Sequence, residues 1–184
     1  MRVSVTMLQY DHGLIRQVID VLGEMCKRRL VERYMMDAKE IVGFLDRFMD
    51  KFHHGKEEKF MFPAAVRNHV MKQEGMDHLL QEHEEARAYV RTMQEALKRG
   101  NMPIFYDSAK KLVEHMTHHI KEEENEFFLK IEEGLDGDED MRVYKEFEAF
   151  TNKMFTEDVY KATESFAQTI QDDILGPSYF ERMA

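Results

Sequence analysis

Cysteine, proline and glycine are scarce in this chain of 184 residues. The single cysteine, Cys26, excludes an internal disulfide framework and any cysteine-rich zinc or iron–sulfur site. Only 3 Pro and 9 Gly interrupt a sequence rich in Glu, Lys, Met, Leu and Ala, which favours helices over strands. No run approaches the about 20 apolar residues that cross a membrane, and the first residues lack the apolar core of a signal peptide. We therefore expect an all-α, cytoplasmic protein.

Basic charge is also in deficit. The net charge of −10 disfavours nucleic acid and an anionic membrane as partners, because both attract basic surfaces. Carboxylates in such excess can instead gather cations. Hydrophobic residues make up 43% of the chain, which is enough for a packed core, and the length suits one domain with an appendage.

Apolar residues recur at helical spacing in four long segments. The segments lie at about 4–29, 38–62, 76–99 and 101–133. Short connections between them predict an up-down-up-down four-helix bundle over residues 1–134. Residues 135–184 carry a further aromatic stripe and are predicted to form a C-terminal helical extension and tail, with a surface that allows a homodimer.

Local signals predict where these helices begin and end. Asp37 is a candidate N-cap with Glu40 three residues later, and Pro63 is expected to end or kink the second helix. Gly75 is expected to close the connection to the third helix. Gly100 suits the residue just after that helix, because glycine tolerates the left-handed conformation.

A similar histidine- and glutamate-containing motif occurs in the second and in the fourth predicted helix. Each copy places a histidine and a glutamate four residues apart, so that both share one helix face. Two registers are available in each copy: His53/Glu57 or His54/Glu58, and His118/Glu122 or His119/Glu123.

Helical phase selects one register in each copy. At about 100° per residue, His53 lies about 80° from the centre of the apolar stripe and His54 about 180° away. In the fourth helix His119 and Glu123 fall within about 80° of the stripe, whereas His118 lies about 180° away. We therefore expect His53/Glu57 and His119/Glu123 to face the core. The side chains expected at the surface are His54, His69, His115, His118, Glu58, Glu122 and Glu124.

The first and third helices each add one histidine near their apolar stripe. His12 lies about 60° from Ile15, and His83 about 60° from Ala86. His78 is a weaker candidate because it falls off the centre of the stripe. The predicted inward set is His12, His53, Glu57, His83, His119 and Glu123.

Imidazole and carboxylate together suit iron, manganese or zinc. Six such ligands are too many for one tetrahedral zinc, but they suit two metals about 3.5–4 Å apart. The glutamates can bridge the metals while the imidazoles fill terminal positions. This leaves an open position for O₂, NO, peroxide or water. Carboxylates buried without a cation are costly, which also favours a metal.

The order and spacing of these residues resemble hemerythrin-like proteins, in particular bacterial proteins with an HHE cation-binding domain. The resemblance covers about residues 5–132. It is carried by Asp11-His12, His53-x-x-x-Glu57 with Met61-Phe62-Pro63, Glu82-His83, and His119-x-x-x-Glu123 with Phe127-Phe128. The family implies a four-helix bundle around a non-haem di-iron centre, bridged by two carboxylates and an oxo or hydroxo group.

The pattern departs from that of oxygen-carrying hemerythrins, which have a fifth histidine in a His-x-x-x-His pair of the third helix and an Asp in the fourth. Here His78 and His83 are five apart, and Glu123 stands four residues after His119. The chain looks more like members with four histidines and two glutamates, which are associated with repair of iron–sulfur centres after nitric oxide or oxidative stress.

The resemblance and the ligand chemistry together define the expected function. We expect two iron ions, with manganese or zinc as substitutes, in a protein that binds or reacts with O₂, NO or peroxide in stress protection or repair of iron centres. The alternative is a metal-dependent sensor or binding module without turnover, and whether the protein is an enzyme stays open. A ferritin-like oxidase is disfavoured because its motif is Glu-x-x-His.

Overall fold

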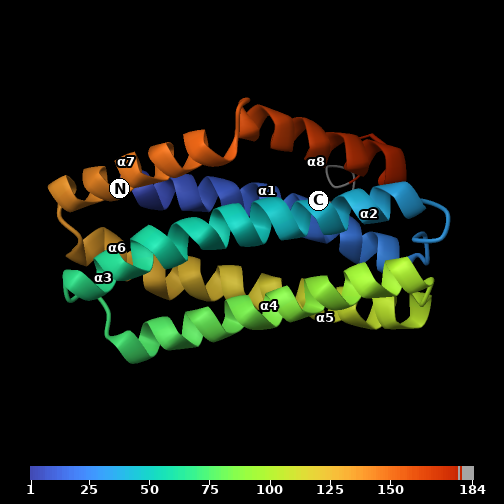
Figure 1. The fold of residues 1–184 in the computed structure, drawn as a ribbon, viewed down its shortest axis with the longest axis horizontal. Helices are drawn as coiled ribbons and strands as arrows, with labels where there is room; N and C mark the ends of the chain where they lie inside the picture. Colours follow the sequence, from blue (N-terminus) through green and yellow to red (C-terminus); the bar gives the residue numbers. More distant parts are fainter. Residues whose placement is uncertain (178, 180–184) are drawn as a thin grey trace.

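Four long helices form the body of the molecule (Figure 1). A computed structural model describes residues 1–177 and 179. The first helix is α1 (Val3–Lys27). The second is continuous and comprises α2 (Met35–Phe44), η1 (Leu45–His54), η2 (Glu57–Met61) and α3 (Phe62–Arg67). The third is α4 (Gln73–Arg99), and the fourth comprises α5 (Met102–Glu122), η3 (Glu123–Phe127) and α6 (Phe128–Gly134).

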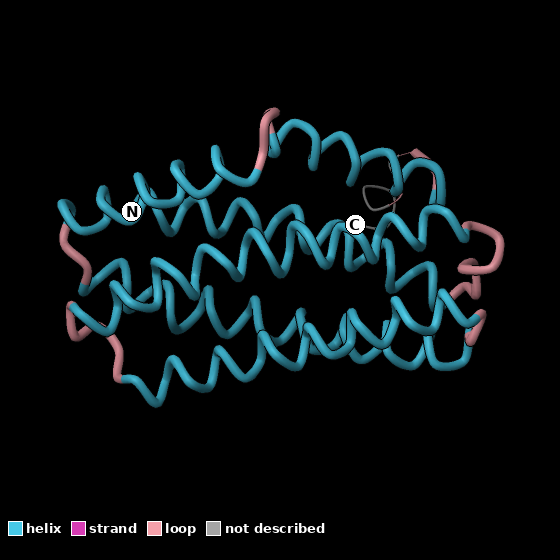
Figure 2. The backbone as a smooth tube through the Cα atoms, viewed as in Figure 1, coloured by secondary structure: helices cyan, strands magenta, loops and turns pink. Residues whose placement is uncertain are grey.

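The helices run alternately up and down, as the short connections predict. Helix α4 packs along α5, and α1 packs along both α5 and α8 (Val159–Leu175). Figure 2 shows short loops between the helices, and no strand occurs in the described part of the chain. The all-α bundle with additional C-terminal helices is therefore confirmed.

The helix ends agree only in part with the sequence signals. Gly100 adopts a φ of 66° at the end of α4, and the Asn101 side chain accepts a hydrogen bond from the Ile104 N–H at the start of α5. The predicted cap at Asp37 is wrong, because α2 already begins at Met35 and Asp37 lies in its first turn.

Two predicted boundaries are also wrong. The second helix does not end at Pro63, which lies directly after a π-helical turn at the start of α3, and the alternative of a kink there stays a prediction. Gly75 does not close a connection, since α4 begins at Gln73 and contains it.

Three π-helical segments, η1, η2 and η3, lie in the second and fourth helices. Their hydrogen bonds run from residue i to i+5, so each turn takes more residues than an α-helical turn, and π-helical turns are frequent at functional sites. The angle between successive residues around the helix axis is therefore smaller than the roughly 100° of a regular α-helix. This smaller angle changes which side chains face the core.

The C-terminal helices α7 (Gly137–Met154) and α8 cover the bundle on one side (Figure 1). Val143 and Phe147 of α7 pack in one apolar cluster with Leu8 of α1. A Cβ atom at Gly55 would lie 3.3 Å from the Phe150 ring, so glycine allows α7 to pack closely on the second helix. The face of the second helix that points away from the bundle core is consequently buried against α7.

The apolar core has two clusters. One contains Leu14, Phe52 and Ala86, and the other contains Leu8 and Met61. Along each helix of the bundle, the predicted metal ligands lie where one cluster gives way to the other. The polar site thus occupies a short layer between two apolar layers that exclude water from it.

Candidate metal centre

The structure brings all six predicted ligands into one buried layer. Each is at most 1% exposed. They come from all four helices of the bundle: His12 from α1, His53 and Glu57 from η1 and η2, His83 from α4, and His119 and Glu123 from α5 and η3.

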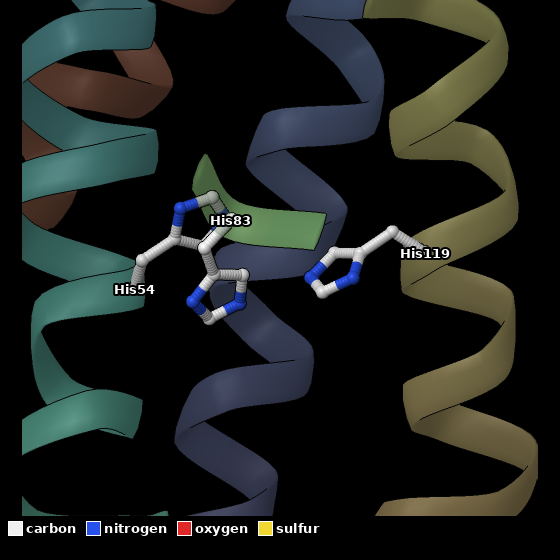
Figure 3. A group of neighbouring side chains, drawn as sticks. All are labelled: His54, His83 and His119. Atoms are coloured by element: carbon white, nitrogen blue, oxygen red, sulfur yellow. The ribbon is translucent and has the colours of Figure 1, made fainter. Parts of the chain in front are cut away.

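His54 lies in the same layer, so the prediction that it faces water is wrong. It is fully buried, and its ring stacks on that of His83 with centroids 3.8 Å apart. Figure 3 shows the rings of His54 and His119 approaching from different helices, with His83 beside His54. The smaller rotation per residue in η1 keeps both His53 and His54 on the inner face. His118, by contrast, is exposed as predicted.

The seven side chains form two groups whose atoms could each hold a metal ion. One consists of His54, His83 and His119, and the other of His12, His53, Glu57 and Glu123. Within each group the candidate ligand atoms lie within 4.8 Å of one another.

Each glutamate lies between a histidine of one group and a histidine of the other. Oε2 of Glu57 is 3.5 Å from Nε2 of both His53 and His83. Oε2 of Glu123 is 3.2 Å from Nε2 of His12 and 3.4 Å from Nε2 of His119. Two donors with metal bonds of about 2.1 Å lie about 3.0 Å apart in an octahedron and about 3.4 Å in a tetrahedron. The observed separations therefore suit shared metal ions.

The inward-facing atoms lack hydrogen-bond partners within the described chain. They are Nε2 of His12, His53, His83 and His119, both ring nitrogens of His54, and both carboxylate oxygens of Glu57 and Glu123. Buried polar atoms are rarely left unsatisfied, and so many in one place need a missing partner. Imidazole nitrogen and carboxylate oxygen are both suitable ligands for a divalent transition metal, so these residues fit such a cation.

The opposite nitrogen of four of these imidazoles is held by a carboxylate. Nδ1 lies 3.0 Å from Asp11 in His53, 2.8 Å from Glu58 in His83, 2.8 Å from Glu82 in His119, and 3.0 Å from Glu124 in His12. Such a contact fixes the ring orientation and directs the free Nε2 towards a metal.

These four carboxylates form a closed circuit around the bundle. In three of the four carboxylate–histidine pairs the carboxylate belongs to one helix and the histidine to the next helix in the chain, and in the remaining pair the carboxylate of the fourth helix contacts the histidine of the first. Each carboxylate is also the sequence neighbour of a candidate ligand, as Asp11 is of His12 and Glu124 is of Glu123. This adjacency is the signal that could have identified Glu58 and Glu124, which were predicted to lie on the outer face.

Arginines hold the half-exposed members of this circuit. Arg16 donates to Glu124 at 2.5 Å, and Arg87 donates to Glu58 at 2.5 Å. Burial opposes ionisation of Glu124, but hydrogen bonds with His12 and Arg16 lower its pKa to about 2. This carboxylate is therefore ionised at neutral pH and suited to accept from the His12 N–H.

Three of the five buried imidazoles are held neutral, which is the form that binds a metal. Burial, reinforced by nearby histidines, lowers the pKa of His53 and His83 well below the usual value. Burial lowers the pKa of His54 to about 4. Despite burial, contacts with Glu123 and Glu124 raise the pKa of His12, and Glu123 and Glu82 raise the pKa of His119. Burial and the charge of Glu123 raise the pKa of Glu57, which shows how costly its negative charge is without a cation.

A buried lysine connects this layer to the C-terminal helices. Nζ of Lys56 lies 2.5 Å from Asp11, donates to the Tyr160 hydroxyl at 3.2 Å, and sits 4.2 Å from the centroid of the Phe52 ring. Asp11 in turn contacts His53. Because helix α8 carries Tyr160, the C-terminal extension contributes to the support of a candidate ligand.

We expect Tyr160→Phe to lower stability measurably. The change removes one partner of the buried Lys56 ammonium, and a hydrogen bond to a charged group contributes about 1.5–3 kcal/mol. At about 2–4 °C per kcal/mol, the melting temperature should fall by about 3–12 °C. Calorimetry checks this. Tyr144→Phe is the matched control, because that hydroxyl bonds to Glu148 at the surface; an equal loss in both variants would show that Lys56 gains nothing from Tyr160.

Comparison with known proteins identifies the family. The family model for the hemerythrin HHE cation binding domain matches residues 3–131. The chain therefore belongs to this family, which implies cation binding, and its buried histidine and glutamate groups could hold a metal ion. No curated protein and no solved structure matches the chain. None of the described helices has the length and apolarity of a membrane span.

Proposed function

We propose that this protein holds a non-haem di-iron centre that binds or reacts with O₂, NO or peroxide, in stress protection or in repair of iron centres. The observation that carries the proposal is the pair of glutamates between two groups of histidines. Glu57 and Glu123 would bridge the two irons. His12 and His53 would hold one iron, and His54, His83 and His119 the other.

The two sides of the centre are unequal. One offers two imidazoles with both glutamates and the other offers three imidazoles, while Glu57 and Glu123 also lie within 3.5 Å of His83 and His119 of the second group. The side with fewer imidazole donors is where a small molecule would complete the coordination of a metal. A bound iron pair supplies Lewis acidity and redox chemistry to that molecule.

Aromatic rings restrict what can reach this layer. The Phe128 ring stacks on His12 with centroids 5.3 Å apart, and the Phe62 ring stacks on His83 at 5.6 Å. Both rings are buried. They favour a small, uncharged molecule over a charged or bulky one, because an ion would lose its hydration in this surrounding.

The number of histidines revises one expectation. The sequence pattern suggested four histidines and two glutamates, because the third helix lacks a His-x-x-x-His pair. His54 of the second helix supplies a fifth buried imidazole. With five buried imidazoles the number of histidines is compatible with reversible binding of O₂. The proposal therefore includes binding without turnover.

The second candidate function is a metal-dependent sensor. The contacts from Tyr160 through Lys56 and Asp11 to His53 favour it, because they link the candidate centre to α8. A change at the metals would alter the position of His53 and, through these contacts, the packing of the C-terminal helices. A metal-dependent change in oligomeric state without turnover of NO or peroxide would support this function over the first.

Anaerobic reconstitution with Fe²⁺ tests the proposal. We expect about two irons per chain, because two groups of ligands are present. Optical spectra before and after air, azide, NO or peroxide should differ, since a small molecule would complete the coordination on the side with two imidazoles. Parallel loading with Mn²⁺ or Zn²⁺ compares the metals. A count of one iron or fewer, or spectra that no added molecule changes, would contradict the proposal.

A further inference from the structure

A second group of histidines and glutamates lies outside the buried layer, between α4 and α5. It contains His78 and Glu82 of α4 with His118 and Glu122 of α5. The histidines are mostly exposed, at 58% and 74%, whereas the carboxylates are largely covered, at 12% and 24%. Water and ions can therefore reach the donors, while the carboxylates are held in place.

We propose that His78, Glu82 and Glu122 form an outer site for a divalent transition-metal cation such as Zn²⁺, and that His118 beside them joins as a fourth ligand after a side-chain movement. The donors are two imidazoles and two carboxylates, which suit such a cation. This site lies outside the buried centre, which it adjoins through Glu82, and its donors belong to neither group of buried ligands.

The donors of His78, Glu82 and Glu122 lie within 4.8 Å of one another, and His118 adjoins both carboxylates. Nε2 of His78 lies 3.3 Å from Oε1 of Glu122 and 3.9 Å from Oε1 of Glu82. Nδ1 of His118 lies 3.7 Å from Oε2 of Glu122 and 3.9 Å from Oε1 of Glu82. Donors on a tetrahedral zinc with bonds of 2.0–2.1 Å are about 3.3–3.4 Å apart. Small side-chain movements would close the site.

Glu82 is already oriented for this role. Its Oε2 accepts a hydrogen bond from Nδ1 of His119 at 2.8 Å, which leaves Oε1 directed towards His78 and His118. One carboxylate thus contacts both the buried layer and the outer group. An oriented donor loses less conformational entropy on binding than a freely rotating one.

The charges around this group also favour a cation. Glu82 and Glu122 offer oxygens within 4.8 Å of each other and of Nε2 of His78. Among the described residues, the ion pairs of both carboxylates are with histidines, and none is with a lysine or an arginine. Two neighbouring carboxylates repel each other, and a divalent cation between them would remove that repulsion.

Titration with Zn²⁺ tests the outer site in full-length protein. Wild type should bind one more Zn²⁺ per chain than His78→Asn or Glu122→Gln, or should bind that ion more tightly. Loss of a residue that only supports a ligand lowers metal affinity by about 10–100-fold, and loss of a direct ligand should exceed this. Glu82→Gln is avoided because that residue also holds His119. The matched control is His69→Asn, which replaces an exposed histidine outside the group, at a φ of 56° that asparagine accepts.

The measured quantity is the difference in bound Zn²⁺ between wild type and each variant. The comparison is therefore valid whether the buried centre contains iron, zinc or no metal. Circular dichroism and the melting temperature verify that His78→Asn and Glu122→Gln remain folded, which their surface positions favour. Equal zinc binding by wild type and both variants would overturn the proposal. A loss of the same size in His69→Asn would also overturn it, because the ion would then bind surface histidines in general.

Discussion

His54→Ala should reduce the iron content of reconstituted protein from about two atoms per chain to about one. The ring of His54 is fully buried, stacks on His83, and has no hydrogen-bond partner for either nitrogen in the described structure. Its removal takes a direct ligand from the iron on that side of the candidate centre. Loss of a supporting residue alone lowers metal affinity by about 10–100-fold, and loss of a direct ligand should exceed this. Metal analysis after desalting checks the iron content.

The control variants separate a ligand from a core residue. His53→Ala should lose metal as His54→Ala does, and His69→Asn should retain the wild-type content because that side chain is exposed. If His54→Ala fails to fold, His54→Gln keeps more of the volume and tests the same loss. Wild-type iron content and an unchanged spectrum in a folded His54 variant would mean that the ring only fills the core.

The sequence contains enough information for the bundle and for most of the buried layer. The apolar stripe of α1 places Leu8, Ile15 and Ile19 in the core, as the periodicity predicts. The positions of His12 and His83 follow from the same periodicity, because both lie in regular α-helices. Local spacing suffices wherever the helix keeps its regular rotation.

His54 shows where local spacing fails. The ten residues of η1 have π-helical hydrogen bonds, so the angle accumulated from Leu45 to His54 is smaller than a regular count gives. No single residue marks this change in the sequence. The fourth helix was predicted correctly at His119 because α5 stays regular through that residue and η3 begins only at Glu123.

Lys56 shows a second limit, which comes from tertiary packing. A lysine beside Glu57 reads as a solvated charge, yet it is fully buried. Asp11 of α1 and Tyr160 of α8 surround it, and these residues are 45 and 104 positions away in the chain. Burial of this kind depends on how α8 lies on the bundle, and helical periodicity within one segment carries no information about that.

Metal removal should lower the melting temperature more than any surface substitution. The oxygens of two buried carboxylates and the inward-facing nitrogens of five buried imidazoles then face one another without hydrogen-bond partners in the described structure. A ligand present at a thousand times its dissociation constant stabilises the folded state by about 4.1 kcal/mol. Two metals would contribute about 8 kcal/mol, which corresponds to about 15–30 °C for a chain of this length. Calorimetry of iron-loaded and chelator-treated protein measures the difference.

Glu57→Gln distinguishes stabilisation by metal from a general effect of the chelator. The amide keeps the shape of the side chain but removes the charge whose burial raises the pKa of Glu57. Without metal, this variant should therefore melt above metal-free wild type, because it lacks the repulsion from Glu123. With metal, it should melt below loaded wild type, because one bridging oxygen is lost. If wild type melts at the same temperature with and without metal, the buried charges are balanced by the protein itself, and the metal-centred reading of this layer fails.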